Sequence, residues 1–189
     1  PLREHSATAT AENTRRLAAL DRQADRELAS RTRRVAFVYV PVLLLLLVIT
    51  DLREEAPWLT AAVILMYGAT GWLRLRLSLD FESAYDAGPA RWRSRFSVAT
   101  LVPAALWGLL LPVIGLEMGF DWTFLVCMLA TAGIAAGSIS SLSPRLRILR
   151  LFVSLLMLPS AATLALAGSG RELGLAALLF VYWAQMLIL

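Results

Sequence analysis

Residues 131–168 read TAGIAAGSISSLSPRLRILRLFVSLLMLPSAATLALAG, two apolar stretches separated by a short segment with a proline and three arginines. The first stretch is the end of an apolar run, 122–143, and the second is the run 151–168. Both runs are close to the length, about 20 residues, that a helix needs to cross a bilayer core. Ser143-Pro144 ends the first stretch, because proline disfavours helical geometry in the residue before it. The sequence here predicts two membrane helices joined by a basic turn.

The composition extends this interpretation to the whole chain. Of 189 residues, 58% are hydrophobic and 17% are charged, against roughly 45–50% apolar residues in soluble domains. Backbone groups in lipid must be bonded within the spanning structure, and the alternation typical of barrel strands is absent, so helices are expected. We predict an all-α integral membrane protein with six transmembrane helices and an N-terminal cytoplasmic amphipathic helix. The six apolar runs are 35–50, 58–73, 97–116, 122–143, 151–168 and 173–189.

Arginine placement predicts the orientation of these helices. All 18 basic residues are arginines: eight precede the first run, five lie in 74–95 and three in 145–150, which leaves Arg53 and Arg171 for the opposite side. Because basic loops stay in the cytoplasm, the N-terminus and both arginine-rich segments are expected there. An even number of spans returns the C-terminus to the cytoplasm as well.

The polar N-terminal segment has a helical pattern of its own. Residues 12–34, ENTRRLAALDRQADRELASRTRR, place Leu17, Leu20, Ala24 and Leu28 at helical spacing. Such a helix either rests on anionic head groups or pairs with a second copy or a downstream domain. We therefore divide the chain into a cytoplasmic tail with an amphipathic helix, 1–34, and a six-helix transmembrane domain, 35–189.

Small residues recur along the fourth apolar run. Gly133, Gly137 and Ser141 follow one another at every fourth position, a spacing that lets two helix backbones approach closely. This pattern predicts a packing seam, with a hydroxyl-lined site as the alternative. In that alternative the polar groups come from Thr131, Ser138, Ser140 and Ser141.

A ligand pocket, if the chain has one, is expected within the bilayer region, because the predicted external loops are short. Two prolines in the third run make it the best candidate for bending around a cavity, with ordinary packing kinks as the alternative. Gln185 is costly in a span unless paired, so it either bonds a neighbouring helix or faces the site. The candidate ligand-binding residues are Pro103, Trp107, Pro112, Thr131, Ser138, Tyr182 and Gln185.

The sequence offers no catalytic or metal-binding set. His5 is the single histidine and lies in the polar tail, so an intramembrane Ser–His pair cannot be built. Cys127 is the single cysteine, which leaves neither a disulfide nor a Cys/His metal cluster. Phosphate-binding and nucleic-acid motifs are also missing. We therefore name no catalytic residue, metal or cofactor and expect no nucleic-acid partner.

Two stretches carry a family resemblance. RSRFSVATLVPAALWG (93–108) and TAGIAAGSISSLSPRLRILRLFVSLLMLPSA (131–161) resemble the multi-span membrane input domains of bacterial sensor histidine kinases, hybrid kinases and diguanylate cyclases. The shared features are a basic residue before a Trp-Gly helix, a small-residue helix ending in a short turn, and a next helix that contains a proline. The resemblance implies a homodimeric sensor module of the bacterial inner (plasma) membrane.

These observations lead to one expected function and two alternatives. We expect a sensory input module that detects a small or lipid-like signal and transmits it through the last helix to a cytoplasmic kinase or cyclase output domain. That domain is expected after Leu189, where the last run stops while still apolar. The alternatives are a small transport or channel subunit and a structural membrane anchor that dimerises its partner. Enzyme activity stays open, since it would belong to the output domain.

Overall fold

The computed structural model describes residues 2–49, 54, 57–117 and 119–188. Within these ranges every regular element is a helix. The helices, in chain order, are α1 (Leu2–Arg34), α2 (Tyr39–Ile49), α4 (Pro57–Leu79), α5 (Phe81–Ala87), α6 (Pro89–Glu117), α7 (Trp122–Leu142), α8 (Leu146–Ala167) and α9 (Gly170–Ile188).

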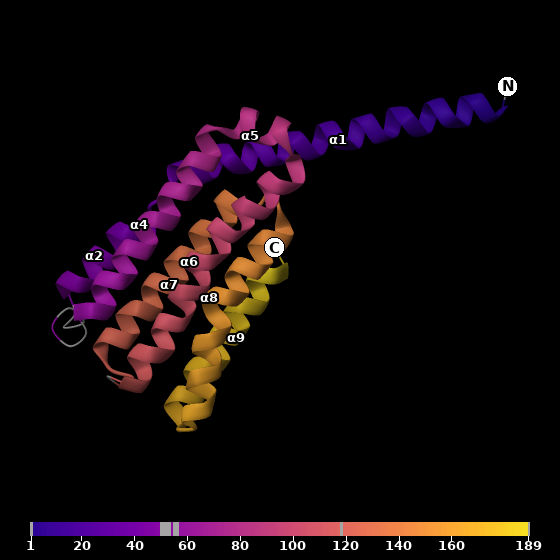
Figure 1. The fold of residues 1–189 in the computed structure, drawn as a ribbon. Helices are drawn as coiled ribbons and strands as arrows, with labels where there is room; N and C mark the ends of the chain where they lie inside the picture. Colours follow the sequence, from indigo (N-terminus) through magenta and orange to yellow (C-terminus); the bar gives the residue numbers. More distant parts are fainter. Residues whose placement is uncertain (1, 50–53, 55–56, 118, 189) are drawn as a thin grey trace.

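Six of these helices run alternately up and down in one bundle: α2, α4, α6, α7, α8 and α9 (Figure 1). The long helix α1 crosses one end of the bundle and projects beyond it. The short helix α5 and the turn between α7 and α8 lie at that same end, where α9 also finishes. The segments that join α6 to α7 and α8 to α9 lie at the opposite end. The arginine-rich segments therefore share one end of the molecule.

Local chemistry explains where the later helices begin and end. The Asp121 carboxylate accepts a hydrogen bond from the Phe124 backbone N–H at 3.3 Å, which caps the start of α7. Helix α7 ends at Leu142, directly before Ser143-Pro144, as the sequence predicts. Helix α8 ends at Ala167, and the next residue, Gly168, has a left-handed φ of 76° that suits glycine at this position.

The centre of the bundle is the contact between α6 and α8. An added Cβ at Gly108 of α6 would lie 2.0 Å from the backbone oxygen of Leu155 of α8. Because glycine has no side chain, the backbones of α6 and α8 can approach one another closely at this position. Trp107, beside this glycine, is fully buried. Helix α9 packs on the other side of α8 and buries few of its residues.

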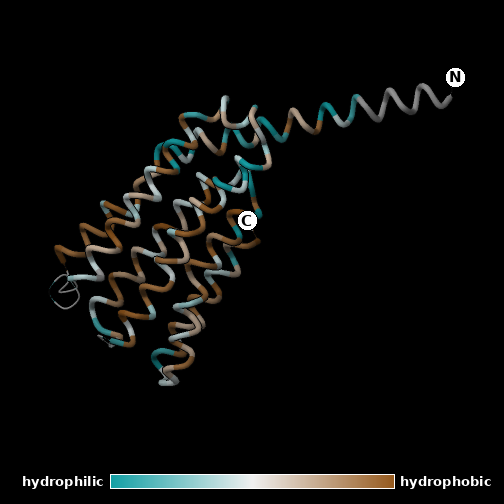
Figure 2. Tube along the Cα trace, in the orientation of Figure 1, coloured by the Kyte–Doolittle hydropathy of each residue, from teal (hydrophilic) through white to brown (hydrophobic). Residues whose placement is uncertain are grey.

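The apolar helices indicate a multi-pass membrane protein. Among the residues that the structure describes, five helical stretches are long and apolar enough to cross a bilayer: Glu12–Ile49, Pro89–Glu117, Trp122–Leu142, Leu146–Ala167 and Gly170–Ile188. The sequence predicted six such spans. The remaining run, 58–73, lies within α4, whose later residues include Arg74 and Arg76 and lower its mean hydropathy. Figure 2 shows hydrophobic residues along the bundle and hydrophilic residues gathered where α1 and α5 lie.

The small residues of α7 do not form the predicted seam with another helix of this chain. Gly133 and Gly137 are exposed, and a Cβ added at either would meet nothing within 4 Å. The neighbouring Ile134 is buried. The close backbone approach occurs instead at Gly108, where a single glycine faces a carbonyl oxygen. The spacing of small residues thus marks an open face of α7 within the described part of the molecule.

Candidate functional site

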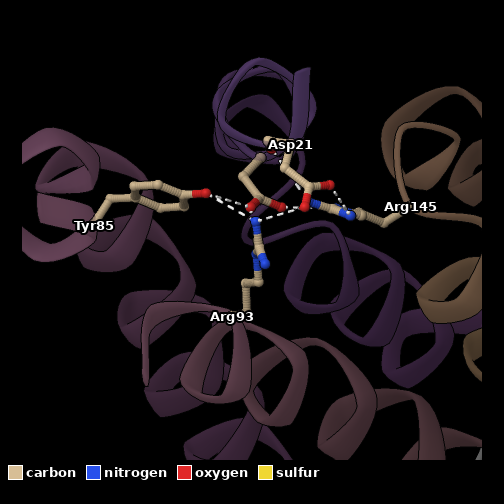
Figure 3. Close-up of polar contacts among 5 residues, drawn as sticks. Asp21, Tyr85, Arg93 and Arg145 are labelled. Carbon is tan, nitrogen blue, oxygen red and sulfur yellow. Dashed lines mark hydrogen bonds and ion pairs between the residues drawn. The ribbon is translucent and has the colours of Figure 1, made fainter. Parts of the chain in front are cut away.

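A buried carboxylate joins α1 to the end of the bundle. Asp25 of α1 is 1% exposed and is held by three side chains from three other segments. Arg93 of α6 donates to its Oδ2 at 2.6 Å, Tyr85 of α5 donates to the same atom at 3.0 Å, and Arg145 donates to Oδ1 at 2.8 Å. We call Asp21, Asp25, Tyr85, Arg93 and Arg145 the Asp25 cluster; in Figure 3, Tyr85, Arg93 and Arg145 reach α1 from different sides.

The other members complete this cluster. Asp21 lies one helical turn before Asp25 and forms an ion pair with Arg145 at 3.0 Å and with Arg93 at 3.5 Å. Arg93 also donates to the Tyr85 hydroxyl at 2.9 Å. Every oxygen of the buried carboxylate is therefore bonded, which offsets the cost of removing its charge from water.

Further polar contacts fix α1 on either side of the cluster. Arg22 and Arg26 each donate to the Glu82 carboxylate of α5 at 2.8 Å. Arg31 donates to the backbone oxygen of Ser140 at 2.9 Å and to the Ser143 hydroxyl at 3.0 Å, at the end of α7. Within α1, Arg31 also forms an ion pair with Glu27, one helical turn earlier. These contacts tie one polar helix to α5, α6 and α7 at once.

The cluster changes the titration of its outer members. The hydrogen bond to Asp25 raises the pKa of Arg145 above its ordinary value. Burial raises the pKa of Tyr85, and its hydrogen bond to Asp25 acts in the same direction. Hydrogen bonds from Arg22 and Arg26 lower the pKa of Glu82. Arg145 thus stays cationic, Tyr85 stays neutral and Glu82 stays anionic around neutral pH.

Inside the bundle, three aromatic rings meet between α2, α4 and α6. Tyr39 and Tyr67 stack with ring centroids 5.0 Å apart, and the Trp107 ring lies 5.8 Å and 6.1 Å from them. Trp107 donates through Nε1 to the Thr131 hydroxyl at 2.8 Å, and Thr131 donates to the Cys127 backbone oxygen at 2.8 Å. This packed cluster fills the place around Trp107 where the sequence suggested a cavity.

A groove lies instead between α2 and α7. Its cavity has a volume of about 490 Å³, within the usual range of ligand pockets, roughly 300–1,000 Å³. Apolar side chains form most of the wall, and the open face of α7 forms one side. Among the lining residues, Leu45 of α2 and Leu129 of α7 are exposed, so the groove opens sideways out of the bundle. Its polar lining consists of Tyr39, Arg74, Ser138 and Ser141.

The predicted ligand-binding residues are dispersed in this arrangement. Ser138 lines the groove, and its hydroxyl donates to the Ala135 backbone oxygen at 2.6 Å. Trp107 and Thr131 bond one another, and Tyr182 of α9 donates to the Ala132 backbone oxygen at 3.2 Å. Gln185 is exposed. Pro103 is buried in α6, and Pro112 is half-buried in the same helix, which continues through both prolines.

Sequence reasoning missed Asp25 and Arg74. The buried stripe of α1 follows positions i, i+3, i+4 and i+7 and consists of Asp25, Leu28, Ala29 and Thr32. An apolar pattern does not reveal this stripe, because its first residue is charged. The predicted stripe began with Leu17 and Leu20, which are 59% and 55% exposed. Within the described ranges no group of three or more His, Cys, Asp or Glu side chains could hold a metal ion.

Comparisons of this chain with family models, with curated proteins and with solved structures find no match. Its function must therefore be argued from the Asp25 cluster and the groove.

Proposed function

We propose that this chain is a membrane-embedded sensory input module of the bacterial inner membrane. A small or lipid-like signal favours one arrangement of the helix bundle, and the change reaches a cytoplasmic kinase or cyclase output domain of the same chain through α9. The Asp25 cluster carries this proposal, because it makes the position of α1 depend on α5, α6 and the turn between α7 and α8. A signal can act only if the bundle has two arrangements that differ in their contacts, and the Asp25 cluster is where such contacts can differ.

The proposal includes an orientation. We place the end that carries α1, α5 and the Asp25 cluster in the cytoplasm, following the arginine distribution. Helix α4 then crosses the membrane as a sixth span beside α2, with Arg74 and Arg76 near its cytoplasmic end. Helix α9 ends on the same side as α1. A reporter inserted after Gly88 is expected to be cytoplasmic, and reporters at Gly119 and Gly170 external; the reverse pattern would overturn the orientation.

A homodimer is part of the same proposal. Leu17 and Leu20 belong to α1, the helix that projects beyond the bundle (Figure 1), and both are more than half exposed. Pairing of α1 with its copy would cover these side chains and connect the two modules on the side where we place the output domain. A change at the Asp25 cluster would then alter the relative placement of two output domains.

The proposal is tested by loosening the Asp25 cluster in the full-length protein. Arg145→Gln removes the charge that binds Asp25 and Asp21. Arg147→Gln removes an exposed charge two residues later, at the start of α8. We expect Arg145→Gln to shift basal kinase or cyclase output severalfold at normal folded yield, with Arg147→Gln close to the unchanged protein. Equal output from all three proteins would contradict a sensory role. Solute flux through the chain with unaltered output would favour transport.

A further inference from the structure

Arg74 is a buried cation that has no counter-charge in the part of the chain that the structure describes. Its side chain belongs to α4, the residue is 3% exposed, and its Nε donates to no acceptor among the described residues. Within the described part of the chain Arg74 forms none of the ion pairs, although other arginines pair repeatedly at the Asp25 cluster. An unpaired guanidinium away from water is costly, since neither solvent nor a carboxylate balances its charge. The site is therefore suited to an anion from outside the chain.

A second donor faces the same cavity. Tyr39 of α2 is 3% exposed, its hydroxyl has no hydrogen-bond partner among the described residues, and it lines the groove together with Arg74. Ser138 and Ser141 complete the polar lining, and both donate their hydroxyl hydrogens to backbone oxygens of α7. One anion held by Arg74 and Tyr39 would satisfy both orphaned donors. The planar guanidinium fork matches the two oxygens of a carboxylate.

The rest of the groove is apolar and elongated. Its wall along α7 runs from Val126 to Leu142, about 24 Å at roughly 1.5 Å per residue. The four polar lining residues are outnumbered by aliphatic and aromatic side chains. Gly133 and Gly137 leave space beside this wall, since a Cβ added at either would meet nothing within 4 Å. A hydrocarbon chain fits such a surface, and the sideways opening gives it a route from the bilayer.

We propose that the groove between α2 and α7 binds a single-chain amphiphile with a carboxylate head group, its head at Arg74 and Tyr39 and its chain along α7. A carboxylate is favoured over a phospholipid head group because the guanidinium is almost completely enclosed and admits only a small anion. The proposal deepens the sensory function proposed above by naming the class of its signal. Ligand in the groove would hold α2, α4 and α7 together at the end where α1 is attached.

Binding is tested with radiolabelled palmitate and the purified chain in nanodiscs of phosphatidylcholine. The unchanged protein is expected to bind one palmitate per chain, and Arg74→Gln to lose affinity by about tenfold or more, as expected for a charged hydrogen bond. Arg76→Gln is the matched control, because Arg76 is an exposed arginine on the same helix and does not line the groove. Methyl palmitate, which lacks the charge, should not compete.

A second variant keeps the test decisive if Arg74→Gln fails to fold. Gly137→Leu is expected to fold normally, since its side chain enters open space, and to lose palmitate binding because that space is the groove. Equal binding by the unchanged protein, Arg74→Gln and Gly137→Leu would overturn the site. Displacement of palmitate by phosphatidylglycerol in the nanodisc, with phosphatidylglycerol binding lost in Arg74→Gln, would overturn the carboxylate assignment in favour of a phospholipid.

The binding assay is independent of any output. Palmitate binding that depends on Arg74 but leaves kinase or cyclase output of the full-length protein unchanged would support the site and contradict the sensory function. Output that responds to the Asp25 cluster in a protein that binds no palmitate would support the function and overturn the site.

Discussion

Arg145 Nε donates to Asp25 Oδ1 at 2.8 Å and thereby joins the turn between α7 and α8 to a helix 120 residues earlier in the chain. Asp25 is 1% exposed, whereas the side chain of Arg145 is 27% exposed. The carboxylate is the enclosed partner, and the arginines approach it from the more accessible side. The position of α1 therefore depends on keeping Asp25 charged and bonded.

Replacing Asp25 by Asn should release α1 from the bundle. The amide cannot pair with two arginines, and the loss is expected to be about 1–3 kcal/mol of unfolding free energy. Thermal unfolding of the purified chain and limited proteolysis within α1 would measure it. Asp21→Asn is the control, because Asp21 has a half-exposed side chain and exposed ion pairs contribute only about 0–1 kcal/mol. Equal loss from both variants would show that the buried carboxylate has no special role.

Acid should weaken the contact between α1 and α5. Hydrogen bonds from Arg22 and Arg26 hold the pKa of Glu82 below its ordinary value, which is about 4.3 for a free glutamate. Because the folded pKa is the lower one, this contribution is present above the unfolded pKa and is lost as pH falls through the folded pKa.

Glu82→Gln tests this pH dependence directly. The melting temperature of the unchanged protein should exceed that of Glu82→Gln at neutral pH, and the two should converge below about pH 4. Unfolding curves recorded from pH 7 downward give the comparison. A constant difference across this range would assign the effect of the substitution to something other than the carboxylate charge.

Gly108 and Gly137 should respond oppositely to the same substitution. Gly108→Ala places a Cβ against the Leu155 backbone oxygen and should cost about 1–3 kcal/mol, as overpacking does. Gly137→Ala meets open space and should leave stability unchanged or raise it slightly, since alanine favours helix. Folded yield and thermal unfolding of the two variants in the same detergent would decide. A tolerant Gly108 would refute the close packing of α6 on α8.

The exposed leucines of α1 should mark the contact between two copies. Leu17→Cys is expected to form disulfide-linked dimers in membranes under mild oxidation, whereas Arg15→Cys, on the opposite side of the helix, should give little product. The native Cys127 is buried and does not compete. Gel electrophoresis without reductant measures the yield. Equal cross-linking at both positions would indicate random collision rather than a defined helix pair.

The helical fold was accessible from sequence because apolar runs and breakers are local signals. Each of the six runs coincides with a helix over most of its described residues, and α7 ends directly before Ser143-Pro144 as expected. The number of membrane-crossing helices was less accessible, since α4 combines an apolar first part with two arginines in its last turns and is not among the five apolar spans.

The candidate sites were less accessible because they depend on pairings between distant segments. Asp25 looks like one more charge in a polar helix until Arg93 and Arg145 are brought to it. The sequence assigns Arg74 to the arginines of the cytoplasmic segment. It does not show that α4 continues to Leu79, nor that the Arg74 side chain is buried in the folded bundle. The small residues of α7 were noticed, but spacing alone does not distinguish a seam from a groove.

The glycine notch at Gly108 limits how the bundle can move. The Leu155 carbonyl oxygen of α8 occupies the place that a side chain at position 108 would take. This contact fixes the position of α6 along α8. Sliding by one turn, about 5.4 Å, would drive that oxygen into the side chains that flank Gly108. Tilting about the notch would leave that oxygen at Gly108. A change that begins in the groove is therefore expected to reach α9 as a pivot of α8, and distances along the helix axes should stay nearly constant while angles change.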